Sequence, residues 1–74
     1  MENIGIRIRQ RREALGLTVW DLSRAASIRE NNIHNWEAGR RIPSDMEALA
    51  RLAEALDTTT DFLIRGTSPV ETAQ

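Results

Sequence analysis

The sequence predicts an all-α domain built from five short helices. Apolar residues recur at the three- and four-residue spacing of a helix face. Side chains that cap helix N-termini precede these segments, and glycine follows three of them. The chain has 74 residues, enough for one small domain, and no cysteine, so neither a disulfide framework nor a cysteine-based zinc site holds the fold.

The first helix is expected over residues 4–15, with Asn3 as its N-cap and Gly16 after its end. Three apolar residues lie near its inner face: Ile4, Ile8 and Leu15. Three arginines are expected outside that face: Arg7, Arg9 and Arg11. Arg12 breaks the pattern, because helical spacing puts it on the side that is expected to be buried.

The second and third helices are joined by a very short turn. Thr18 begins the second helix, and Asp21 completes a capping box three residues later. Its inner side consists of Leu22, Ala25 and Ala26. Ser27 either occupies the tight turn or itself caps the third helix, with Glu30 answering it. In both cases the connection is three or four residues, which is typical of a helix-turn-helix.

The third helix, about residues 29–38, has two contrasting faces. Ile33 and Trp36 lie together on one side, with Glu37 beside them. The opposite side carries Asn31 and Asn35, flanked by His34 and Ala38. Amides both donate and accept hydrogen bonds, and asparagine pairs bidentately with adenine in the DNA major groove. The alternative is that these amides only face solvent.

The second half of the chain predicts two more helices. Residues 40–43 form an extended basic connector, because the residue before a proline avoids the helical region. Ser44 with Glu47 starts the fourth helix, and Thr58 with Asp61 starts the fifth. Their expected core residues are Met46, Leu49, Leu52, Ala53, Leu56, Phe62 and Leu63. We expect the domain to span residues 1–66 and residues 67–74 to form a flexible tail.

The charges are unevenly distributed along the chain. Residues 1–43 hold eight arginines against five acids, whereas residues 44–74 hold two arginines against six acids. The net charge is only −1, so composition by itself does not indicate nucleic-acid binding. A basic half joined to an acidic half suits a protein with one anion-facing side, although ordinary surface variation would suit it too.

Several classes of protein are not expected. No apolar run approaches the roughly 20 residues that span a bilayer, and the N-terminus lacks a signal-peptide profile, so we expect no membrane contact and a cytoplasmic protein. His34 is the single histidine, and the chain has no phosphate-binding glycine loop. The acids form no paired constellation beyond the helix caps. We therefore expect neither an enzyme nor a metal or cofactor site.

An ordered series of motifs runs through nearly the whole chain. It consists of Arg7-Ile8-Arg9, Arg12, Gly16-Leu17-Thr18, Asp21-Leu22, Ile28, Ile33, Trp36-Glu37-Ala38-Gly39, Ile42-Pro43-Ser44, Leu49, Leu52-Ala53, Leu56 and Asp61-Phe62-Leu63. In this spacing the chain resembles the lambda-repressor/Cro-like (XRE-type) helix-turn-helix family of DNA-binding domains. The resemblance implies a five-helix bundle whose third helix enters the major groove.

The resemblance also implies roles for individual residues. The base-reading positions are Asn31, Asn35 and Glu30, with Asn32 and His34 as further candidates. Glu30 could accept from cytosine or only cap its helix, and the cap is favoured. The implied phosphate-binding residues are Thr18, Val19, Arg40 and Arg41. Val19 stands where glutamine is frequent, so a phosphate contact there must come from its backbone N–H.

Arg12 acquires a structural role from the same resemblance. The family pattern pairs it with Glu37, across the join between the first and third helices. Both residues lie beside apolar faces, so we expect a buried ion pair, with solvation at a helix edge as the alternative. Trp20 departs from the family because this position is usually polar. Its ring is expected to fold back on the first helix or, failing that, to mark an association surface.

The expected function is a sequence-specific transcriptional regulator that acts as a repressor on double-stranded DNA. One domain of this size covers few base pairs, so we expect a homodimer on a two-fold-related operator, with half-sites about 34–36 Å apart. The alternative is a protein-interaction module on the same fold, such as an antitoxin that grips a toxin or a docking domain of a larger assembly.

Overall fold

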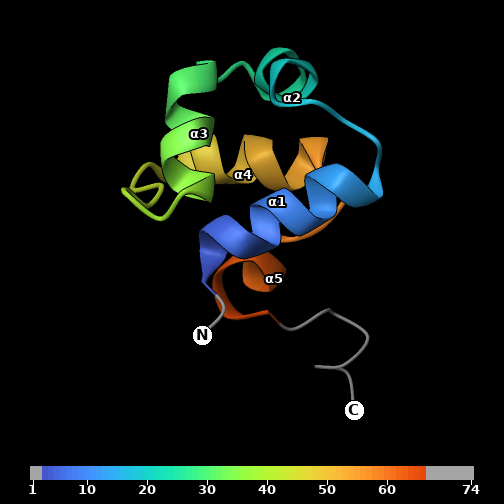
Figure 1. Ribbon diagram of the computed structural model, residues 1–74. Coiled ribbons are helices and arrows are strands. Elements are labelled where there is room, and N and C mark those ends of the chain that lie inside the picture. The colour runs from blue at the N-terminus through green and yellow to red at the C-terminus, as the bar shows by residue number, and fades with distance from the viewer. Residues whose placement is uncertain (1–2, 67–74) are drawn as a thin grey trace.

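Five helices form where the sequence predicts them (Figure 1). The structure, a computed structural model, describes residues 3–66. The helices are α1 (Ile4–Ala14), α2 (Val19–Ala26), α3 (Glu30–Glu37), α4 (Met46–Ala55) and α5 (Thr60–Arg65), and the described residues contain no strand. The all-α fold class is therefore confirmed. The tail expected over residues 67–74 lies outside the described residues.

Two of the predicted helix starts hold and two are displaced by one residue. The Asn3 side chain accepts from the Ile6 N–H, and Thr18 and Asp21 form the full capping box. The N-caps of α4 and α5 are Asp45 and Thr59, so the predicted caps Ser44 and Thr58 are wrong. The Thr58 N–H instead donates to the Ala53 carbonyl at 2.9 Å, which keeps Thr58 in the turn that closes α4.

Ser27 occupies the tight turn between α2 and α3. Its φ of 57° is left-handed, and the next N–H, of Ile28, donates back to the Ser23 carbonyl at 3.0 Å. Arg29 therefore stands at the N-cap of α3, where it makes no side-chain capping bond. The alternative in which Ser27 caps α3 with Glu30 answering it is therefore wrong, and Glu30 stands as the acidic residue of the first turn of α3.

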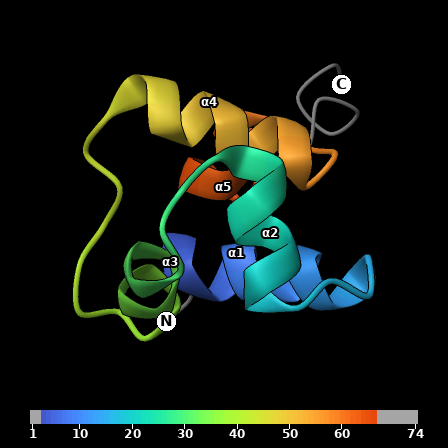
Figure 2. The same cartoon turned by 90° about the horizontal axis from the view of Figure 1, so that it is seen from above.

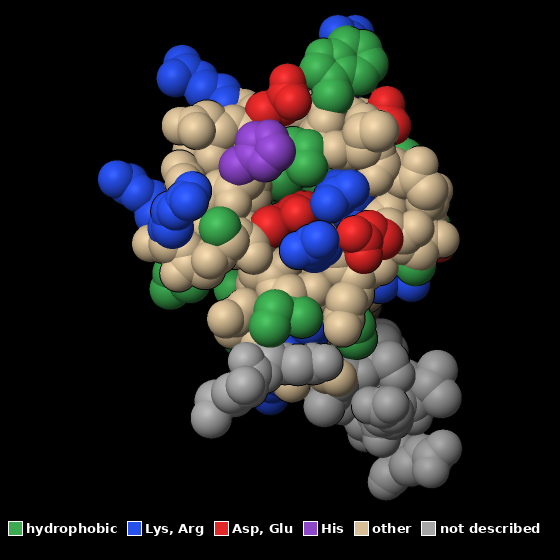
Figure 3. All heavy atoms as spheres, in the orientation of Figure 1, with side chains coloured by type: hydrophobic (Ala, Val, Ile, Leu, Met, Phe, Trp, Pro, Cys, Tyr) green, Lys and Arg blue, Asp and Glu red, His purple; other side chains and the backbone are tan. Residues whose placement is uncertain are grey.

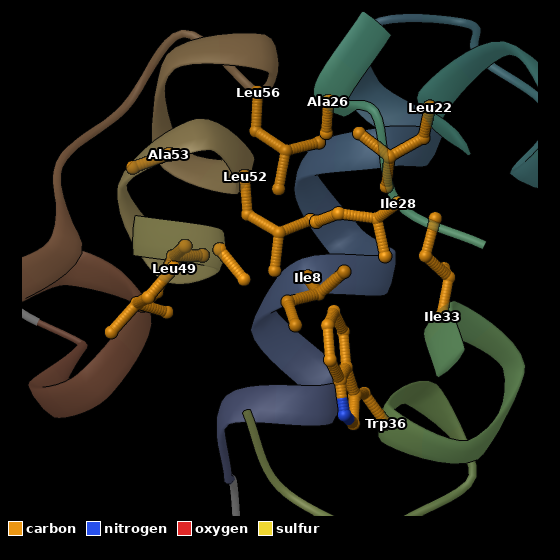
Figure 4. Close-up of a cluster of buried hydrophobic side chains, with 12 residues drawn as sticks. Ile8, Leu22, Ala26, Ile28, Ile33, Trp36, Leu49, Leu52, Ala53 and Leu56 are labelled. Atoms are coloured by element: carbon orange, nitrogen blue, oxygen red, sulfur yellow. The ribbon is translucent and has the colours of Figure 1, made fainter. Parts of the chain in front are cut away.

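The core lies where α1 and α4 meet the other three helices. Helix α1 contacts α3 and α5, and α4 contacts α2 and α5 (Figures 1 and 2). The buried apolar side chains that Figure 4 draws between them are Ile8, Leu22, Ala26, Ile28, Ile33, Trp36, Ala48, Leu49, Leu52, Ala53, Leu56 and Leu63. No helix within residues 3–66 is both long and apolar enough to cross a membrane.

Three residues expected on inner faces are exposed. Met46 is 72% exposed because it begins α4 beside the connector, which loops away from the helices (Figure 2). Leu15 is 41% exposed at the C-cap of α1, one residue past the helix. Ala25 also faces outward. The predicted inner faces are therefore correct in the middle of each helix and wrong at these edges.

Arg7 is buried, contrary to the expectation that it lies outside the inner face. It is only 7% exposed, and its guanidinium donates to the carbonyls of Leu63 at 2.8 Å and Ile64 at 2.7 Å. Two other arginines behave similarly. Arg11 donates to the Leu56 carbonyl at 2.9 Å, and Arg51 donates to the Ala26 carbonyl at 2.9 Å. We call Arg7, Arg11 and Arg51 the carbonyl-directed arginines.

These three arginines supply hydrogen-bond donors to carbonyls at the C-terminal ends of helices. The last carbonyls of a helix lack an N–H partner within the helix and need another donor. The carbonyl-directed arginines reach the C-terminal ends of α5, α4 and α2 respectively, and a cation is also favoured there by the helix dipole. Each one therefore ties its own helix to the end of another.

Gly5 allows α1 and α3 to approach closely. A Cβ atom added at Gly5 would lie 2.0 Å from the Trp36 carbonyl oxygen, far inside van der Waals contact. Only glycine fits at this crossing, which sets how α3 sits against the bundle.

Candidate nucleic-acid interface

Helix α3 presents its polar residues outward from a buried apolar rear. Ile33 is fully buried and Trp36 is 8% exposed. On the other side Asn31 is exposed and Asn35 is partly exposed. Neither asparagine side chain forms a hydrogen bond within the part of the chain that the structure describes, so both amides are free to bind an external partner.

The remaining base-reading candidates occupy different parts of this surface. Glu30, Asn32 and His34 are all exposed. Asn31 and Asn32 line a hollow of about 590 Å³ between α3, the connector and the start of α4. His34 instead lines a second hollow, beside α2. Asn31 and Asn32 therefore border one hollow and His34 another, while Glu30 and Asn35 border neither of the two.

An ion pair fixes the C-terminal end of α3 to α1. Arg12 Nε lies 2.8 Å from Glu37 Oε2, and Nη2 lies 3.1 Å from Oε1, so the contact is bidentate. The two side chains are only 13% and 10% exposed, so the pair is not solvated at a helix edge. The third nitrogen, Nη1, donates to the Leu17 carbonyl at 2.8 Å.

The charge of this pair is stabilised by its geometry. The hydrogen bond with Glu37 raises the pKa of Arg12 above its ordinary value, while burial opposes that rise. All three guanidinium nitrogens have partners. The arrangement holds α3 in place and offers nothing reactive.

The N-terminus of α2 offers two backbone donors. The Thr18 N–H and hydroxyl oxygen are both used in the capping box with Asp21, at 3.0 Å each. The hydrogen bond from the Thr18 N–H lowers the pKa of Asp21, which keeps that carboxylate ionised. The N–H groups of Val19 and Trp20 come next and find no acceptor among residues 3–66. Free N–H groups at a helix N-terminus suit phosphate oxygens.

A small hollow lies between this N-terminus and α3. It has a volume of about 300 Å³ and is lined by Arg9, Arg12, Val19, His34, Glu37 and Ala38. We call it the α2–α3 hollow. Figure 3 shows the face that carries the histidine, in purple, together with several arginine and acidic side chains. Sequence reasoning does not single out Arg9 for this site, since its neighbours here belong to other helices.

Arg40 and Arg41 follow α3 on the connector. Their N–H groups donate to the Asn35 carbonyl, at 3.0 Å and 3.4 Å, and both residues are exposed. Arg41 lines the larger hollow together with Arg29 and Arg51. In the described part of the chain, exposed basic side chains thus follow the C-terminal end of α3. The free N–H groups at the N-terminus of α2 lie beside α3 at the α2–α3 hollow.

Trp20 does not fold back on α1. It is 54% exposed, and the Arg24 guanidinium lies 4.9 Å from the centre of its ring, within its own helix. The favoured expectation for this ring is therefore wrong.

Side chains that could bind a metal ion do not gather in the described part of the chain. Within residues 3–66, no group of three His, Cys, Asp or Glu side chains lies close enough together to bind one metal ion.

A family model described as a helix-turn-helix domain matches residues 3–63. The P22 c2 repressor, solved in complex with a synthetic operator, has a TM-score of 0.85 and 30% identity over 90% of this chain and 100% of that one. SinR bound to DNA has a TM-score of 0.77 and 23% identity over 81% of this chain and 95% of that one.

SinR in its complex with the SinI protein has a TM-score of 0.79 and 22% identity over 84% of this chain and 60% of that one. At these identities the SinR structures show the fold alone. No match is found among curated proteins. The family match and the P22 c2 repressor cover almost the whole helical region described above. The chain belongs to the helix-turn-helix domain family, in its lambda-repressor-like (XRE) type.

Proposed function

We propose that this protein is a sequence-specific DNA-binding transcription regulator that acts as a repressor, with α3 inserted in the major groove. The observation that carries the proposal is the unused pair of amides on α3. The side-chain amides of Asn31 and Asn35 have no hydrogen-bond partner in the described region, yet the helix that carries them is fixed from behind by Ile33, Trp36 and the Arg12–Glu37 pair. Preorganised donors and acceptors of this kind suit base edges.

The proposed phosphate contacts lie on both sides of these amides. The N–H groups of Val19 and Trp20, with the Thr18 hydroxyl hydrogen, serve one strand. Arg40 and Arg41 serve the other side through their charge. Such contacts position the helix without specifying sequence.

The protein acts on DNA as a homodimer in this proposal. One helix of eight residues reads few base pairs, so specificity requires a second copy on a two-fold-related half-site about 34–36 Å away. Ile64, 49% exposed near the end of α5, lies where the family resemblance puts the dimer contact. The P22 c2 repressor, solved on an operator, supports DNA binding by a domain of this fold.

The same proposal gives the protein no catalytic step, metal or cofactor, and a place in the cytoplasm with the nucleoid. This part of the proposal rests on the family, and on the fact that binding in a DNA groove requires no reactive group.

The test begins with selection of bound duplexes from random DNA, followed by affinity measurements on single-base variants of the selected site. Each substitution, Asn31→Ala or Asn35→Ala, is expected to remove about 1–3 kcal/mol of discrimination at one base pair. The matched control is Gln10→Ala, which removes an exposed amide from α1. An unchanged preference among the site variants would refute base reading by these residues.

A protein-interaction module is the second candidate. The observation that favours it is Trp20, a large exposed ring on α2, and SinR provides a relative in fold that is solved with a protein partner, SinI. A toxin or a regulator would be such a partner. Salt distinguishes the two candidates, because binding that neutralises several phosphates weakens steeply between about 50 and 200 mM salt. A module that binds only proteins would show no DNA affinity even at about 50 mM.

A further inference from the structure

His34 and Asn31 border different hollows, although they lie only three residues apart on α3. His34 lines the α2–α3 hollow together with Val19, whereas Asn31 lines the larger hollow on another side of α3. Val19 supplies a free N–H of the α2 N-terminus. The single histidine of the chain therefore lies beside a proposed phosphate contact.

The two arginines that line the α2–α3 hollow beside His34 are each paired with an acid. Arg12 is neutralised by Glu37 in the bidentate pair, and Arg9 is paired with Glu13 at 3.3 Å.

Two further acids belong to the neighbouring helix ends. Asp21 is held in the cap of α2, and Glu30 lies one turn before His34 on α3. The two arginines and four acids named here sum to a charge of −2, so a proton on the imidazole lowers the negative charge that an approaching phosphate meets to −1.

We propose that His34 binds a DNA phosphate in its protonated form, so that the protein binds DNA more tightly as the pH falls. The inference rests on the proposed function and adds a residue and a regulating variable to it. Histidine is the side chain whose charge ordinarily changes between about pH 5 and pH 8. Its protonated ring donates from both nitrogens and attracts an anion, whereas the neutral ring donates from one.

The sign follows from which form binds more tightly. The protonated ring favours the complex, so DNA binding takes up a proton, and the affinity rises as the pH falls. Because a phosphate is present in every sequence, the effect is the same on specific and nonspecific DNA.

The experiment compares wild type, His34→Gln and His34→Arg at about pH 8 and about pH 5.5, on the two sides of the ordinary histidine titration. Two probes are used, the duplex selected above and a mixed-sequence duplex of the same length. The wild type is expected to bind both probes about tenfold more tightly at the lower pH, the scale of one charged hydrogen bond. His34→Gln stays weak at both pH values, and His34→Arg stays tight at both.

Salt dependence gives a second readout. One added phosphate contact steepens the slope of log K against log salt by about 0.9, so the wild-type slope is expected to steepen at the lower pH and the His34→Gln slope to stay constant. His34→Gln also serves as the control for every other titrating group. Its melting temperature is expected to match the wild type, because His34 is exposed and makes no side-chain hydrogen bond within residues 3–66.

Three results would overturn the inference while leaving DNA binding intact: no change with pH, the same change in His34→Gln, or a change confined to the selected duplex. The last would make His34 a base-reading residue. If the wild type binds neither duplex at either pH in about 50 mM salt, the proposed function itself fails, and the inference fails with it.

Discussion

Helix α1 is held on two sides, and the two sides use arginine in different ways. Against α3, Arg12 makes a bidentate pair with the Glu37 carboxylate. Against α5, Arg7 donates to the main-chain carbonyls of Leu63 and Ile64. The contact with α3 depends on the identity of two side chains. The carbonyl contacts with α5 depend on the identity of one, because any residue supplies a carbonyl.

The largest expected effect is on the α3 side. Arg12→Ala leaves the Glu37 carboxylate nearly buried without its guanidinium, and breaking such a pair costs about 3–5 kcal/mol. For a domain of this size each kcal/mol lowers the melting temperature by about 4–8 °C, so a loss of at least about 12 °C is expected. Thermal unfolding followed by far-UV circular dichroism measures it.

Arg9→Ala is the matched control for this substitution. Arg9 lies on the same helix and pairs with Glu13, but the two side chains are 62% and 56% exposed. An exposed pair of this kind contributes at most about 1 kcal/mol. If Arg12→Ala destabilised the domain no more than Arg9→Ala does, the difference between buried and exposed pairs would not hold here.

Gly5→Ala tests the same crossing through the backbone. The new Cβ would meet the Trp36 carbonyl oxygen at 2.0 Å, so α1 and α3 must separate. We expect a loss of about 3 kcal/mol, the upper end for overpacking, because the obstructing atom belongs to the main chain. The helix propensity gained by alanine, about 0.5–1 kcal/mol, offsets only part of this.

The control for Gly5→Ala is Gly16→Ala. Gly16 has a φ of +71°, but a Cβ added there would have no heavy atom within 4 Å, so only backbone strain of about 1–2 kcal/mol is expected. Urea unfolding compares the two variants. Equal losses of unfolding free energy in the two variants would mean that the close approach of α1 to α3 adds nothing to the cost of Gly5→Ala.

Arg7→Met gives the smallest of the three expected losses. It keeps an apolar stem and removes the donors to the Leu63 and Ile64 carbonyls. A loss of about 2 kcal/mol is expected, the scale of hydrogen bonds from a charged group. Hydrogen exchange of α5 amides is expected to rise while that of α3 amides stays unchanged. Faster exchange in α3 would contradict the separation of the two sides.

The sequence predicts best those features that depend on side-chain identity. The five helices, the short connection between α2 and α3 and the outward face of Asn31 follow from caps, glycines and periodicity, whereas the sequence leaves the place of Ser27 in that connection open. Arg12 stands out because a charge falls on an apolar face, and the family resemblance supplies Glu37 as its partner. The DNA contacts of these residues stay predictions.

The features that the sequence does not reveal depend on the main chain. Arg7 looks like an exposed arginine because its acceptors, two carbonyls, leave no mark in the sequence. Gly5 gives no signal either, since its neighbour is the carbonyl of Trp36. The predicted N-caps of α4 and α5 fall one residue early because each start offers two adjacent residues able to cap.

The carbonyl-directed arginines have a consequence for sequence divergence. A bond to a main-chain oxygen survives replacement of the residue that carries the oxygen, provided that the helix still ends there. These bonds therefore place no requirement on the side chains of acceptor residues such as Ile64 and Asp57, whereas they do require Arg7, Arg11 and Arg51. In each of these hydrogen bonds only the donor depends on side-chain identity. A small protein held together in this way can exchange many of its residues and keep the same arrangement of helices.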